Sequence, residues 1–118
     1  MDISEENAII GFDPNKSQIS IDRLAEFIQT QITGDLSEVP GLGDFGIKKL
    51  KKENISTTFA LMGKFLILKE KGVEPIEHCD RFFYWLTSVG ITSHKHTITQ
   101  AIAQKLDISF PGIYESNF

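Results

Sequence analysis

The stretch VPGLGDFGIKKL, residues 39–50, decides how this chain folds. It begins with an apolar residue and a proline, places Leu42 between two glycines, and continues with Ile47 and Leu50 three positions apart. Proline and glycine are strong turn residues, and a spacing of three is that of one helix face. The stretch therefore predicts a tight turn that leads into a short helix ending near Asn54.

The turn and the helix together are suited to hold a phosphate group. A helix N-terminus exposes unpaired N–H groups and carries a partial positive charge. Glycines at positions 41 and 43 let a phosphate oxygen approach the main chain, while Leu42 is expected to point inward and anchor the turn. Lys48 and Lys49 add charge in the first turns of the helix. A corner between two packed helices has the same pattern, so both interpretations stand at this point.

Apolar periodicity predicts five short helices and an all-α fold. Their expected ranges are 21–33, 44–54, 57–70, 76–89 and 93–106. Ser20 and either Ser56 or Thr57 are expected to cap helix starts. Pro75 suits the first position of the fourth helix, and Gly34 stands where the first helix should stop.

The chain of 118 residues suits one domain with a modest core. Residues 1–18 lack a sustained period and are expected to form a loose N-terminal arm. Residues 19–107 are expected to form a compact bundle of about five helices that contains a helix-hairpin-helix motif. Residues 108–118 are expected to form an irregular C-terminal tail.

Composition narrows the class of protein. The chain is 41% hydrophobic and 24% charged, as is common in globular proteins, and it has no apolar run of about 18 residues that would span a membrane. The acidic N-terminus MDISEEN lacks the features of a secretory signal. A single cysteine, Cys79, excludes a disulfide framework and a cysteine-rich zinc site. We therefore expect an intracellular protein without a membrane partner.

Charge is unevenly distributed along the chain. Residues 1–43 carry eight acids and two bases, a net charge of −6. Residues 44–71 carry three acids and seven lysines, a net charge of +4. Residues 72–118 carry five acids and three bases, a net charge of −2. Positive potential is thus concentrated just after the glycine turn, as either a focused anion-binding patch or a solvated helix face.

The run PGLGDFGIKKLKKENISTTFALMGKFLILK (40–69), followed by FFYWL (82–86) and Gly90, resembles the barrier-to-autointegration factor family. That family shows a glycine-hydrophobic-glycine hairpin, a Lys-Lys-Leu helix, and then a Leu-Gly-x-Phe-Leu-hydrophobic-Leu-Lys segment. Here the last segment reads MGKFLILK (62–69), and an aromatic Trp-Leu pair follows at a similar distance. The likeness covers about residues 20–106 and is strongest at 39–69 and 82–90.

The resemblance implies a compact helical homodimer of a chromatin type that binds double-stranded DNA without reading its sequence. It also implies contacts with LEM-domain proteins of the nuclear envelope and with histones, and a nuclear or cytoplasmic location in a eukaryote. The residues that it assigns to DNA binding lie in the hairpin, in the helix that follows it and after Gly90. They are Gly41, Leu42, Gly43, Phe45, Gly46, Lys48, Lys49, His94 and Lys95. The main-chain amides of positions 41, 43, 45 and 46 would contact phosphate.

The sequence gives little support for an enzyme active site or for a metal site. His78 adjoins Cys79, but neighbours on a helix point about 100° apart and do not form a nucleophile–base pair. The spacing of the histidines suggests no set of three or four zinc ligands. The aromatic run at 82–85 is expected to serve the core or a dimer contact rather than to stack on bases. We expect no enzyme activity, metal or cofactor.

Two other functions remain open at this stage. The acidic first third of the chain motivates a protein-interaction or oligomerisation module on the same fold that has lost DNA binding. An accessory role beside a nuclease or polymerase is a third interpretation, because such proteins also carry helix-hairpin-helix motifs.

Overall fold

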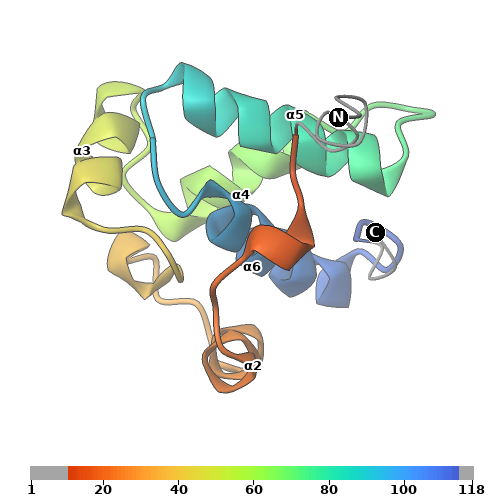
Figure 1. Ribbon diagram of the computed structural model, residues 1–118, viewed down its shortest axis with the longest axis horizontal. Coiled ribbons are helices and arrows are strands. Elements are labelled where there is room, and N and C mark those ends of the chain that lie inside the picture. The colour runs from red at the N-terminus through yellow and green to blue at the C-terminus, as the bar shows by residue number, and fades with distance from the viewer. Residues whose placement is uncertain (1–10, 115–118) are drawn as a thin grey trace, which may run out of the picture.

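The computed structural model describes residues 11–114 (Figure 1). Within that range the chain forms five α-helices and two short 3-10 helices, without a strand, so the predicted all-α class is confirmed. In chain order the elements are η1 (Pro14–Lys16), α2 (Ile21–Gln29), η2 (Leu36–Glu38), α3 (Asp44–Lys52), α4 (Thr58–Ile67), α5 (Pro75–Ser88) and α6 (Lys95–Ser109). No helix in the described part is long and apolar enough to cross a membrane.

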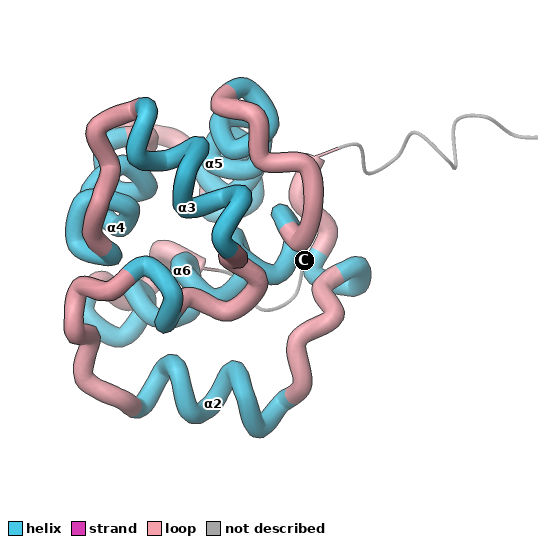
Figure 2. The backbone as a smooth tube through the Cα atoms, turned by 90° about the vertical axis from the view of Figure 1, so that its left-hand side faces the viewer, coloured by secondary structure: helices cyan, strands magenta, loops and turns pink. Residues whose placement is uncertain are grey.

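Helix α6 forms the centre of the molecule. Its residues Ile98, Ala101 and Ile102 are fully buried, and Leu106 is nearly so, as their helical spacing predicts. The helix packs against α2, α4 and α5. Both views show α6 between α5 on one side and α2 on the other (Figures 1 and 2). The last helix of the fold therefore holds the others together.

Helix starts follow the local sequence. The Ser20 hydroxyl accepts a hydrogen bond from the Arg23 amide at 3.1 Å and caps α2. The Thr57 hydroxyl accepts one from the Ala60 amide at 3.0 Å and caps α4. Pro75 is the first residue of α5, where its fixed φ suits a helix and its missing N–H costs nothing. These starts are the predicted ones.

Three helix ends differ from the prediction by three residues or more, and one of them is the end of α4, which stops at Ile67 rather than at residue 70. Helix α2 stops at Gln29 rather than near Gly34, and at this end the Lys105 ammonium donates to the Ile28 and Thr30 carbonyls at 2.6 and 2.7 Å. Helix α6 continues to Ser109, beyond the predicted end at 106. A contact from a residue 75 or more positions away cannot be read from local periodicity.

Residues 11–19, here called the N-terminal strap, run along α5 and α6 to the start of α2 (Figure 1). The Phe12 ring is 1% exposed, and its amide donates to Asp80 Oδ1 at 2.8 Å. The Asp13 amide donates to His96 Nδ1 at 3.0 Å. This part of the predicted loose arm is therefore packed onto the helices. Positions 1–10 and 115–118 of the predicted arm and tail lie outside the described residues.

The aromatic run of α5 belongs mainly to the core. Phe82 and Phe83 are 0% and 6% exposed, whereas Tyr84 is exposed. Cys79 is fully buried, and burial raises the pKa of its thiol to about 12, which keeps it protonated and unreactive. His78 is buried with Nε2 at 2.6 Å from the Phe65 carbonyl. The core role of the aromatic residues was expected from the sequence, whereas the burial of His78 was not, since a solvent-facing or helix-end position was expected for the histidines.

Candidate nucleic-acid interface

The first glycine turn comprises residues 39–43. The Leu42 amide donates to the Val39 carbonyl at 3.1 Å, which closes a four-residue turn. Gly41 has φ +86°, a left-handed conformation that glycine adopts without strain. Val39 and Leu42 are buried, as expected for anchors of the turn. The turn is preceded by the 3-10 helix η2 and followed by α3, so it reorients the chain between two helical elements.

The second glycine turn comprises residues 90–94, between α5 and α6. The Gly90 amide donates to Thr87 and the Ile91 amide to Leu86, each at 3.0 Å, which is the Schellman pattern of a helix end. Gly90 has φ +98° and Ile91 is buried. His94 occupies the left-handed region with φ +59° and stands at the cap position of α6.

Each glycine turn packs against the helix that follows the other turn. A Cβ atom on Gly41 would lie 3.1 Å from His94 Cβ and 3.1 Å from Thr97 Cγ2, at the start of α6. A Cβ atom on Gly90 would lie 3.2 Å from Lys49 Cδ, on α3. Each glycine thus permits a close approach that a larger residue would prevent. The structure thereby brings together two segments that are about 50 positions apart in the sequence.

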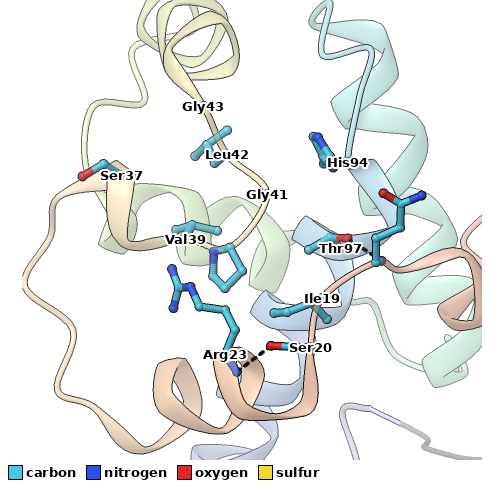
Figure 3. Close-up of a pocket in the computed structure, with 12 residues that line it drawn as sticks. Ile19, Ser20, Arg23, Ser37, Val39, Gly41, Leu42, Gly43, His94 and Thr97 are labelled. Carbon is cyan, nitrogen blue, oxygen red and sulfur yellow. Dashed lines mark hydrogen bonds between the residues drawn. The ribbon is translucent and has the colours of Figure 1, made fainter.

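The turns border two grooves. The larger has a volume of about 630 Å³ and lies between the first turn, the end of the strap and the starts of α2 and α6 (Figure 3). Its lining consists of Gln18, Ile19, Ser20, Arg23, Ser37, Val39, Pro40, Gly41, Leu42, Gly43, His94 and Thr97. The smaller, of about 100 Å³, is lined by Gly41, Leu42, Gly43, Phe45, Gly46, Ile91, Thr92, Ser93, His94 and Ile98. The predicted residues 41–43 and His94 are shared by both grooves.

Three helices begin at the larger groove. Ser20, Gly43 and His94 are the cap residues of α2, α3 and α6, and all three line it. Side-chain capping bonds are absent at α3 and α6 in the described structure, whereas Ser20 caps α2 with its own hydroxyl. Uncapped first-turn amides and aligned helix dipoles favour an anion. The groove is therefore suited to bind a negatively charged group.

Gly43 and Gly46 serve the site in different ways. A Cβ atom on Gly43 would meet no other atom within 4 Å, and the residue is exposed, so the space on this side of the main chain is open. A Cβ atom on the buried Gly46 would lie 2.7 Å from Leu42 Cδ1. Gly46 thus allows Leu42 to pack beneath the turn, while Gly43 leaves the approach clear.

The predicted cationic residues are placed in three ways. Lys48 is exposed on α3. The Lys49 ammonium lies 5.0 Å from the centre of the Phe45 ring, beside the second turn. The Lys95 ammonium donates to Thr87 Oγ1 at 2.8 Å and lies over the Phe83 ring, so it contacts α5 rather than either groove. His94 is therefore the predicted residue of the second turn that reaches the site.

Sequence reasoning missed the contribution of α2 and of the strap. Arg23 reaches from α2 toward the first turn, and its guanidinium donates to the Glu38 carbonyl at 3.0 Å (Figure 3). Thr97 lines the groove and binds the strap, since its hydroxyl accepts from the Gln18 amide at 3.1 Å. One part of this contribution could be read from the sequence, because Ser20 is recognisable as the cap of a helix. Its position beside the glycine turn depends on tertiary packing.

His96 of α6 is a titratable group near the site, and its pKa is lowered. Burial lowers the pKa of its imidazole, and the neighbouring Lys16 and Lys95 lower it further, whereas the Asp13 carboxylate raises it. Its Nδ1 accepts a hydrogen bond from the strap and must therefore be unprotonated. In the described residues, no group of three or more His, Cys, Asp or Glu side chains is arranged to hold a metal ion.

Comparison of the chain with models of known protein families, with curated proteins and with solved structures finds no match.

Proposed function

We propose that this chain is a non-enzymatic protein that binds the phosphate backbone of double-stranded DNA without reading its sequence. The observation that carries the proposal is the convergence of uncapped α3 and α6 starts on one groove beside two glycine turns. A phosphate oxygen placed there would accept hydrogen bonds from amides of the first turn of α3. Such contacts depend on the backbone of the protein and of the DNA, so they are independent of base identity.

Charge on α3 supports the proposal. Lys48, Lys51 and Lys52 are exposed on this helix, next to the first glycine turn. Lysine side chains on the flank of a phosphate site attract further phosphates along a duplex. Of the acidic side chains of α2, Glu26 is exposed, lies 3.7 Å from the Arg23 guanidinium, and lines a separate groove with Phe27 and Thr30. The DNA path that fits this distribution follows α3.

The proposal is tested by measuring the affinity for a mixed-sequence duplex as a function of salt. We expect retention at low salt, equal affinity for unrelated sequences, and a steep linear decrease of log K with log salt concentration. Lys48→Ala should weaken binding and reduce this slope, whereas Lys71→Ala, in the turn before α5, is the matched control. Wild-type protein that does not retain duplex DNA at low salt would refute the proposal.

Gly43→Gln tests the phosphate site itself. The backbone at Gly43 has φ −101°, which any residue adopts, and the space around its Cβ position is open. The variant should therefore keep its helical content by circular dichroism and lose most of its DNA affinity, because the new side chain blocks the α3 amides. Unchanged affinity would place the binding surface elsewhere.

We also propose that the protein is a homodimer that associates through α4. Phe59 and Ile67 are 59% and 64% exposed, and Ala60 and Gly63 are exposed on the same face. Positions four and eight apart share one side of a helix, and the glycine would allow two such helices to approach closely. The face is self-complementary in a two-fold arrangement. Gly63→Gln should prevent this association, so the variant should have the mass of a monomer when it is measured by light scattering.

The exposed α4 face also supports the alternative function of a protein-interaction module without DNA affinity. The two functions are separated by two measurements on the same sample. A dimer that retains duplex DNA supports the leading proposal, and a dimer without such affinity at low salt selects the alternative.

A further inference from the structure

Phe45 stands out among the exposed apolar side chains. Eight large apolar residues of the described chain are exposed, and Phe45, at 58%, is the one that lines a groove between the two glycine turns. It is the second residue of α3, two positions after Gly43. The proposed phosphate site uses the main chain at this position and leaves the aromatic ring without a role.

The ring lies next to a cation and next to the amides of the proposed site. The Lys49 ammonium is 5.0 Å from the ring centre, one helical turn further along α3. The smaller groove is otherwise lined by three glycines, by the short side chains of Thr92 and Ser93, and by the larger side chains of Leu42, Ile91, His94 and Ile98. An aromatic face, a cation and unpaired amides thus meet within one turn of helix. These are the groups that a nucleotide requires for its base and its phosphate.

We propose that Phe45 stacks on an unpaired base and gives the protein a preference for DNA whose bases are already unstacked, such as a gapped duplex. The inference rests on the proposed DNA binding and extends it from the backbone to the state of the bases. Bases in an intact duplex are covered by their neighbours, and extruding one costs free energy. At a gap the base opposite the missing nucleotide is unpaired and this cost is smaller, so the ring gains a partner that intact DNA does not offer.

The alternative role of Phe45 is structural packing. It does not fit the structure well, because more than half of the residue is exposed, whereas Leu42, Ile91 and Ile98, which line the same groove, are buried. Replacing the ring by leucine should therefore leave the fold intact. The same replacement removes stacking, since leucine has no aromatic face.

The experiment compares the affinity of the full chain for two duplexes of one sequence, one intact and one with a single-nucleotide gap. We expect the gapped duplex to bind at least about fivefold tighter, as one stacked base contributes. Phe45→Leu should abolish this difference between the two duplexes. Phe45→Trp should preserve the difference. A 2-aminopurine opposite the gap should lose fluorescence with the wild-type protein and not with Phe45→Leu.

Phe110→Leu is the matched control. Phe110 is a phenylalanine of similar exposure, 49%, at the opposite end of α6 from the glycine turns. A helix of 15 residues places it about 22 Å away. The control should retain the preference for gapped DNA.

Equal wild-type affinity for the two duplexes, or a preference that survives in Phe45→Leu, would overturn the inference and leave the backbone proposal standing. Absence of binding to both duplexes would overturn both.

Discussion

The two glycine turns share a backbone plan and differ in what they offer to a ligand. Each places a glycine with positive φ before a buried aliphatic residue, Leu42 in the first and Ile91 in the second. The first ends at Gly43, an exposed cap without a side chain, and the second ends at His94, whose side chain lines the grooves. The first turn therefore presents amides, and the second presents an imidazole.

In the proposed mode of DNA binding, this difference gives the two turns separate roles on one surface. Backbone amides fix the position of an anion with little conformational freedom, whereas a side chain adjusts to what has been bound. The turns also differ in what their glycines contact. A Cβ atom added at Gly41 would approach β and γ atoms of His94 and Thr97, whereas one added at Gly90 would approach the flexible side chain of Lys49. Substitutions can therefore distinguish the turns by stability as well as by binding.

The largest effect is expected for Gly41→Val. The substitution forces a branched residue to φ +86° and into atoms of His94 and Thr97 that would lie 3.1 Å from its Cβ. We expect a loss of about 3 kcal/mol in the free energy of unfolding, measured by urea denaturation. Gly43→Ala, with open space and an ordinary φ, should change it by less than about 1 kcal/mol. Similar losses for both variants would contradict the assignment of separate roles.

A smaller effect is expected for Gly90→Ala. The backbone at φ +98° strains any residue with a Cβ, but the nearest atoms belong to the Lys49 side chain, which can move aside. We expect a loss of about 1–2 kcal/mol in the same denaturation experiment. A loss that exceeds that of Gly41→Val would show that the second turn is the more rigid of the two.

Acidification should destabilise the protein near the second turn, because His96, a titratable hydrogen-bond acceptor, lies on α6, the helix that follows this turn. Burial lowers the pKa of His96 below the ordinary value of 6.5, so the unfolded chain binds a proton at a higher pH than the folded chain. The free energy of unfolding should therefore fall as pH decreases below about 6.5, and level off below the folded pKa. Protonation also removes the Nδ1 acceptor of the Asp13 amide, which should then exchange faster with solvent.

The control for this prediction is His96→Gln, whose side-chain oxygen can accept the same hydrogen bond without titrating. Its stability should depend less on pH between 7.5 and 5. Some dependence should remain, because burial also lowers the pKa of His78. Identical pH profiles for the variant and the wild type would exclude His96 as the sensitive group.

The smallest effect is expected for His94→Gly. Glycine relieves the left-handed strain at φ +59° but increases the freedom of the unfolded chain, so the two terms nearly offset each other. We expect a change within about 0.5 kcal/mol in the free energy of unfolding. A decrease in DNA affinity without loss of stability would show that the imidazole contributes to binding. Unchanged affinity would assign the anion site to the first turn alone.

The sequence predicted those parts of the fold that depend on neighbouring residues. Helix starts at Ser20, Thr57 and Pro75 follow from local capping chemistry, and the turn at 39–43 follows from its glycines. The end of α2 was not predicted, and the carbonyls there accept hydrogen bonds from Lys105, a residue of α6 that lies far away in the sequence. Local rules fail where a distant side chain supplies the hydrogen bonds.

The candidate site was predicted in the same uneven way. The first turn was identified as a whole, since its residues are contiguous. The contribution of residues 94 and 95 to DNA binding stays a prediction; the structure places His94 and Thr97 beside Gly41, and Lys95 against Thr87. The approach of α2 and of the strap could not be deduced, because it depends on where α6 packs.

The central position of α6 has a consequence for synthesis. On a ribosome the earlier helices emerge first, yet Lys105, Thr97 and His96, which hold α2 and the strap, all belong to α6. The groove therefore has no complete wall until this helix has left the exit tunnel. Chains interrupted before α6 lack the residues that hold α2 and the strap, so they cannot form the groove as the folded protein does.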